Sequence, residues 1–310
     1  MHRRTNKTTT RREQYNKLKV FSLLKQRIMT SAVLAPLALI LVFYTPLSLF
    51  SVIAASIVLL GAWEWASLMG ISKPLYRLVY VAITGVFITI LHFHWPIESL
   101  WHSGKLVADA NYVFTLAAAW WIVATLLVMR YPKMAKSWSQ GLVMPAIAGF
   151  LTLIPLWLAL NVLRSAEYQA SEQFGSVLIM VVLGIVWSAD IGAYFAGKNL
   201  GKRKLMPNVS PNKTIEGLIG GLITAVVFVL IFCYCSNVEH KQWLLYGVLT
   251  VVIALFSAIG DLLESMFKRE AGLKDSGSCL PGHGGILDRI DSLTAAAPMF
   301  ALFYAWTVTL

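Results

Sequence analysis

Apolar residues occur in this chain as long runs, separated by short polar segments. Several runs approach the roughly 20 apolar residues that an α-helix needs to cross the hydrocarbon core of a bilayer. The pattern predicts an all-α polytopic integral membrane protein with about nine transmembrane helices. We place these helices at residues 28–44, 47–66, 77–93, 112–130, 141–162, 176–197, 216–236, 242–267 and 289–309.

Lysine and arginine alternate in density along the loops between these runs. If the N-terminus is cytoplasmic, the inner segments hold 23 of the 26 basic residues and the outer segments hold 3. This bias favours a cytoplasmic N-terminus and a C-terminus on the outer side, because positive loops stay inside. The same distribution argues against a nucleic-acid partner despite the net charge of +11, since no single basic patch forms.

The composition agrees with a membrane protein. Charged residues make up 13% of the chain, about half the roughly 25% of a soluble domain. Residues 1–27 are basic and polar, and longer than the basic region of a secretory signal. We predict that they form a disordered cytoplasmic tail attracted to anionic lipid, ahead of one transmembrane catalytic domain over 28–310.

The segment 265–291 combines charge and glycine between two apolar runs. Ionisable residues at a membrane boundary are costly to keep, so they indicate a functional site. Just before and within this segment, the i, i+3, i+4, i+7 spacing places a carboxylate, a second carboxylate, a hydroxyl and an ammonium on one helix face. These residues are Asp261, Glu264, Ser265 and Lys268.

Glycines and two further acids follow that helix. Gly284 and Gly285 allow backbone amides to approach a ligand closely. Asp288 and Asp291 lie three residues apart at the start of the last helix. Asp261 and Asp288, at two helix ends, offer the hard oxygen ligands that Mg²⁺ takes together with phosphate oxygens. Cations able to neutralise phosphates are Lys268, Arg269, Lys274 and Arg289.

Two polar residues stand out at another pair of helix ends. Asp190 lies about two turns inside the sixth apolar run, where it either serves in a polar cavity or is a buried carboxylate satisfied by a neighbouring helix. Asn212 is expected to cap the next helix, with Lys213 in the first turn. A bound anion there would offset the conflict between the lysine and the helix dipole.

Carboxylates, cations and a glycine loop at a membrane face indicate phosphoryl or nucleotidyl transfer. The spacing alone does not distinguish the two reactions. The chain has no GxxxxGK[ST] sequence, so it does not support a Walker-type nucleotide site.

The run S-x-F-K-R-x4-K-D-x-G-x2-L-P-x-H-G-G-I-x-D-R-I-D at 265–291 resembles the signature of the phosphatidate cytidylyltransferases, also called CDP-diacylglycerol synthases. Residues 62–65 and 210–217 and the segment around Asp190 are also similar to that family. The resemblance implies an enzyme that joins CTP and phosphatidate to give CDP-diacylglycerol and pyrophosphate. It further implies Mg²⁺ with K⁺ as a second candidate ion, a homodimer, and an active site facing the cytoplasm from the inner cell membrane.

On this hypothesis, each candidate residue has an expected role. His283 is expected to orient substrate groups rather than to act as an acid or base, because a phosphate monoester is already anionic at pH 7. The expected metal ligands are Asp261 and Asp288. The expected catalytic residues are Lys268, Lys274, Asp275, His283, Asp288, Arg289 and Asp291. The expected substrate-binding residues are Asp190, Lys213, Ser265, Arg269, Gly284 and Gly285.

Three other functions are alternatives to this one. A CTP-dependent lipid or polyprenol kinase would use the same types of residue. A transporter would suit intramembrane acids, but the sequence shows no repeated halves and its motif lies in a loop. An alcohol phosphatidyltransferase would carry a D-G-x2-A-R-x8-G-x3-D-x3-D pattern, which the sequence lacks.

Overall fold

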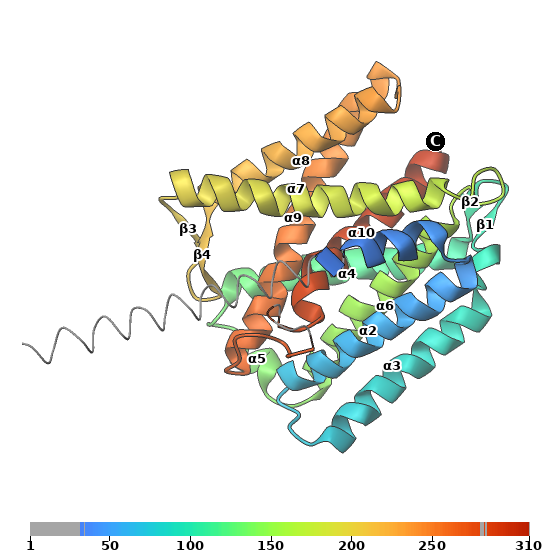
Figure 1. Ribbon diagram of the computed structural model, residues 1–310. Coiled ribbons are helices and arrows are strands. Elements are labelled where there is room, and N and C mark those ends of the chain that lie inside the picture. Colours follow the sequence, from blue (N-terminus) through green and yellow to red (C-terminus); the bar gives the residue numbers. More distant parts are fainter. Residues whose placement is uncertain (1–31, 34, 280–281, 283, 310) are drawn as a thin grey trace, which may run out of the picture.

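The computed structural model describes residues 32–33, 35–279, 282 and 284–309. These residues form helices joined by short loops and two small antiparallel hairpins (Figure 1). The helices are Ala35–Tyr44, α2 (Leu47–Leu68), α3 (Pro74–His94), α4 (Ala108–Arg130), α5 (Ala135–Ser139), α6 (Val143–Ser165), α7 (Phe174–Leu200), α8 (Ile215–Cys235), α9 (His240–Glu270) and α10 (Leu287–Thr309), with a 3-10 turn η1 (Ile97–Ser99). The hairpins pair β1 (Trp101–His102) with β2 (Lys105–Leu106), and β3 (Lys204–Met206) with β4 (Ser210–Thr214).

The helices follow the predicted apolar runs, which confirms the largely helical membrane class. Within the described residues, 7 helices are long and apolar enough to cross a membrane, namely α2, α3, α4, α6, α7, α8 and α9. The helix at Ala35–Tyr44 is shorter, and α10 falls outside this set. The prediction of nine spans is therefore supported only in part. The predicted tail at 1–27 lies outside the described residues.

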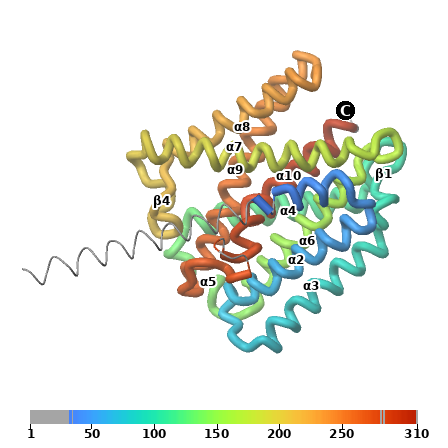
Figure 2. The backbone as a smooth tube through the Cα atoms, viewed as in Figure 1, coloured from blue at the N-terminus to red at the C-terminus, as the bar shows by residue number. Residues whose placement is uncertain are grey.

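Helix α10 forms the centre of the bundle. It contacts α2, α4, α6, α7 and α9, and Figure 2 shows it running between these helices. Ala295, Ala296 and Ala297 are fully buried, because small side chains let neighbouring helices approach closely. Because α10 is surrounded by other helices, its sides need not all face lipid. Its position fixes where its acidic first turn lies.

Helices α7 and α8 pack backbone against backbone. A Cβ atom at Gly221 would lie 2.6 Å from the carbonyl oxygen of Ala189. A Cβ atom at Gly192 would lie 2.2 Å from Oγ1 of Thr224. Only glycine fits at these points, so the two helices form a closely joined pair. Figure 1 shows the end of α8 and the start of α9 as a hairpin that projects from the rest of the molecule.

The start of α8 differs from the prediction. Oγ1 of Thr214 accepts a hydrogen bond of 3.1 Å from the amide of Gly217, so Thr214 is the N-cap. The expectation that Asn212 caps this helix was wrong, and Lys213 lies in β4 rather than in the first helical turn. The cause is strand pairing: β4 pairs with β3, which keeps residues 210–214 extended.

Loops predicted to lie on the same side gather at the same end of the molecule. Figure 1 shows α5, the β3–β4 hairpin and residues 271–279 at one end, and the β1–β2 hairpin at the other. Ser139 donates to Glu270 at 2.7 Å, which joins the α5 segment to the end of α9. Nε of Arg269 donates to the carbonyl oxygen of Val209 at 3.2 Å, which joins α9 to the β3–β4 hairpin.

Candidate active site

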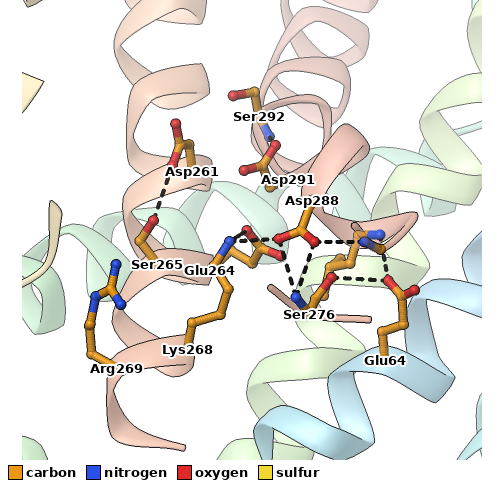
Figure 3. Close-up of polar contacts among 12 residues, drawn as sticks. Glu64, Asp261, Glu264, Ser265, Lys268, Arg269, Ser276, Asp288, Asp291 and Ser292 are labelled. Carbon is orange, nitrogen blue, oxygen red and sulfur yellow. Dashed lines mark hydrogen bonds and ion pairs between the residues drawn. The ribbon is translucent and has the colours of Figure 1, made fainter. Parts of the chain in front are cut away.

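Acidic residues from α9 and from the first turns of α10 face one another (Figure 3). The spacing along α9 places Asp261, Glu264 and Lys268 on one helix face, as the sequence predicts. Helix α10 supplies Asp288 and Asp291. The two helices approach closely at Gly260, where a Cβ atom would lie 2.5 Å from the carbonyl oxygen of Asp291.

The ammonium of Lys268 joins the two helices. Its Nζ atom donates to Oε2 of Glu264 at 2.5 Å and to Oδ1 of Asp288 at 2.7 Å. The three side chains are only 11%, 2% and 6% exposed, in the order lysine, glutamate, aspartate. A buried charge without a partner is strongly unfavourable, so each acid depends on this ammonium.

Asp288 also organises the loop that precedes it. Oδ2 of Asp288 accepts the amide of Gly285 at 2.8 Å and the amide of Ser276 at 3.1 Å. Gly284 has φ of +83°, and a Cβ atom there would lie 2.8 Å from Oδ2 of Asp288. Glycine is therefore needed at 284 both for the backbone conformation and for the space. In this structure the Gly285 amide points to Asp288.

A cavity of about 490 Å³ lies between α7, α8, α9 and β4. Asp190, Lys213 and Asp261 line it together with apolar residues, so Asp190 shares this cavity with a lysine and a second acid. Nζ of Lys213 lies 2.6 Å from Oδ2 of Asp261. Oγ of Ser265 donates to Oδ1 of the same aspartate at 3.2 Å. Asp261 thus belongs both to the wall of the cavity and to the acidic face of α9.

The donor set fits a hard divalent cation. Four carboxylates gather here, while the lysines paired with them are Lys213 and Lys268. Oε1 of Glu264 is buried and has no hydrogen-bond partner among the described residues. Although these carboxylates lie near one another, no three His, Cys, Asp or Glu side chains in the described ranges are arranged so that they alone could hold a metal ion. Mg²⁺ commonly takes only one or two carboxylates together with water and phosphate oxygens, so this arrangement suits it.

Two functional candidates were missing from the predicted site residues. Glu264 shares the buried ammonium, and its place on the predicted helix face was the available signal. Glu64 of α2 is only 1% exposed, and it accepts hydrogen bonds from the loop before α10. The signal for Glu64 was a single acid inside an apolar run.

The remaining predicted residues lie around this centre. Lys274 and Asp275 are exposed in the segment between α9 and α10, and Arg289 is exposed on the first turn of α10. Arg269 is exposed and binds the β3–β4 hairpin. His283 lies outside the described residues. The structure thus brings together the acids, Lys268, Lys213 and Ser265.

Comparison with known proteins agrees with the family resemblance seen in the sequence. The model of the family described as "Cytidylyltransferase family" matches residues 25–307. This chain belongs to that family. A phosphatidate cytidylyltransferase of Haemophilus influenzae is 43% identical over 294 residues, which is 91% of this chain and 99% of the relative. One of Pseudomonas aeruginosa is 42% identical over 279 residues, covering 90% and 96%. One of Bacillus subtilis is 38% identical over 184 residues, covering 59% and 66%.

Replacing Lys268 with methionine is expected to destabilise the protein by about 3–5 kcal/mol, because Glu264 and Asp288 would stay buried without their ammonium. Thermal unfolding in detergent measures the effect. Lys241→Met is the matched control, since Lys241 pairs with Glu239 while both side chains are more than half exposed. The control is expected to change stability by less than about 1 kcal/mol. Equal unfolding temperatures for Lys268→Met and the wild type would contradict the importance of this buried cluster.

Proposed function

We propose that this protein transfers the cytidylyl group of CTP to phosphatidate, giving CDP-diacylglycerol and pyrophosphate. The family match over residues 25–307 supports this function. Two relatives named phosphatidate cytidylyltransferase, aligned over 91% and 90% of the chain, support it as well. The observation that carries it in the structure is the ammonium of Lys268, held between Glu264 and Asp288 on the acidic face that also bears Asp261. Fixed cations beside carboxylates suit a reaction that moves negative charge between phosphates.

The reaction requires an oxygen of the phosphatidate phosphate to attack the α-phosphorus of CTP. The new P–O bond forms as the bond between the α-phosphorus and the bridging oxygen breaks, and pyrophosphate leaves. The attacking phosphate is already anionic at pH 7, so the site needs no strong general base. Lys213 at the cavity and Lys268 beside it would offset phosphate charge. Their carboxylate partners hold both ammonium groups in place before substrate binds, which favours reactive alignment.

We infer that Asp261 and Asp288 hold Mg²⁺, alone or with K⁺, when the substrates are bound. The cation would neutralise charge on the CTP phosphates. The carboxylates that gather at this face around only two paired lysines support a cation here. The homodimer implied by the family resemblance stays a prediction.

We propose that the site opens to the cytoplasm from the inner cell membrane, with the N-terminus inside and the C-terminus outside. The sequence bias of 23 basic residues on the inner segments against 3 on the outer ones supports this orientation. CTP is a cytoplasmic nucleotide, so a site at this end would meet its substrate directly.

Radiolabelled CTP tests the reaction with purified protein and phosphatidate. We expect label at the α-phosphate to enter lipid, and label at the γ-phosphate to leave as pyrophosphate. Asp288→Asn is expected to abolish transfer, because the carboxylate both orients Lys268 and serves as a proposed metal ligand. Asp109→Asn, at an exposed acid in the first turn of α4, is the matched control and should keep full activity. Entry of γ-label would instead indicate a CTP-dependent lipid kinase, and flux without pyrophosphate would indicate a transporter.

Chelation tests the metal. Removing divalent cations with EDTA is expected to abolish transfer, and added Mg²⁺ should restore it. Asp261→Asn should raise the Mg²⁺ concentration needed for half-maximal rate, because the site would lose one hard anionic ligand. Unchanged Mg²⁺ dependence in that variant would remove Asp261 from the ligand set.

Two natural cysteines test the orientation. Cys279 is exposed in the segment between α9 and α10, and Cys235 is exposed at the other end of α8 from the β3–β4 hairpin. In intact cells, a membrane-impermeant maleimide is expected to label Cys235 but to reach Cys279 only after permeabilisation. Cys279→Ser and Cys235→Ser variants assign the signals. Labelling of Cys279 in intact cells would reverse the proposed orientation.

A further inference from the structure

Glu64 lies on α2, more than 200 positions from the loop that it binds. Its side chain is buried, and its carboxylate accepts hydrogen bonds from a hydroxyl and from backbone amides of this loop. Oε2 accepts from Oγ of Ser276 at 3.1 Å and from the amide of Leu287 at 2.7 Å. Oε1 accepts from the amide of Ile286 at 3.1 Å. Among the described residues, the salt bridges do not include Glu64, and the groups that donate to it include a hydroxyl and two backbone amides.

The donors that bind Glu64 come from the same short segment as the donors that bind Asp288. Ser276 gives its hydroxyl to Glu64 and its amide to Asp288. The amide of Gly285 binds Asp288, while the next two amides, at Ile286 and Leu287, bind Glu64. Figure 3 shows the two carboxylates on either side of this segment. The position of the loop, and with it the first turn of α10, is therefore set from both sides.

Two positions in this segment must be glycine because the Glu64 carboxylate leaves no space for a side chain. A Cβ atom at Gly277 would lie 2.2 Å from Oε1 of Glu64. A Cβ atom at Gly285 would lie 2.4 Å from Oε2 of Glu64 and 2.2 Å from Oγ of Ser276. Neither glycine has positive φ, so space rather than backbone conformation requires them. The loop is thus shaped to bring its backbone against this one carboxylate.

We propose that Glu64 is a positioning residue for cytidylyl transfer: it holds Ser276, Ile286 and Leu287 so that Asp288 keeps the ammonium of Lys268 in place. It acts through the loop and does not touch the reacting atoms. The proposal rests on the proposed function and adds a residue from α2 to a site otherwise built from α9, α10 and the cavity wall. Removing such a supporting carboxylate leaves substrate contacts present but misaligned.

Glu64→Gln tests the proposal, because glutamine keeps the shape but turns an NH₂ group toward donors that need an acceptor. We expect kcat to fall about 10–100-fold, with KM for CTP and phosphatidate nearly unchanged. Hydrogen exchange of the Ile286 and Leu287 amides should become about tenfold faster. Ser276→Ala removes one of the same hydrogen bonds, so its effect on kcat should be less than additive with that of Glu64→Gln.

Trp157→Phe is the control for a purely structural effect. It removes a buried hydrogen bond of 3.2 Å from α6 to the Ser51 carbonyl, on the same helix as Glu64 but away from the loop. This variant is expected to lower the unfolding temperature while kcat stays near wild type. Wild-type kcat in Glu64→Gln would overturn the proposal, and so would a fall in kcat without faster exchange of the Ile286 and Leu287 amides. A third contrary result would be a fall in kcat in Trp157→Phe as large as that in Glu64→Gln when the two variants are equally stable. Failure of the wild-type protein to make CDP-lipid would overturn the proposed function instead, and the exchange measurement would still test the loop contact.

Discussion

The ammonium of Lys268, shared by Glu264 and Asp288, is the interaction on which the centre of this protein depends. Two carboxylates that are 2% and 6% exposed would not stay ionised in a membrane-protein interior without a cation between them. The bridge crosses from α9 to α10 and so fixes the register of these helices at the point where Gly260 brings their backbones together. Asp288 then carries this constraint outward to the loop through the Gly285 and Ser276 amides.

Asp261 connects this buried cluster with the neighbouring cavity. It lies one turn before Ser265 on the acidic face of α9, and it meets Lys213 from β4 at the cavity wall. The arrangement therefore has two adjoining parts with different surroundings. One is an enclosed charge cluster with little exposure, and the other is an open space with both polar and apolar walls. Such a pairing suits a reaction between a highly charged nucleotide and a lipid.

The sequence predicts the helices well and the contacts between distant segments less well. Long apolar runs determine the helices because a bilayer leaves few other ways to satisfy the backbone. The acidic face of α9 follows from local spacing, and the structure confirms that its residues converge. The start of α8 could not be read in this way, because pairing of β4 with β3 overrode a reasonable capping pattern at Asn212. Glu64 was missed since its partners lie in a remote loop, and local pattern carries no information about such pairing.

Helix α9 has a further consequence because of its length. Its 31 residues, at about 1.5 Å each, extend about 46 Å, whereas the hydrocarbon core of a bilayer is only about 30 Å thick. The helix runs without interruption from the projecting α8–α9 hairpin to the acidic face (Figure 1). A change in bilayer thickness that tilts the hairpin therefore acts on a rigid rod whose other end bears Asp261, Glu264 and Lys268. The projecting hairpin and the charged face of the site are thus two ends of one continuous helix.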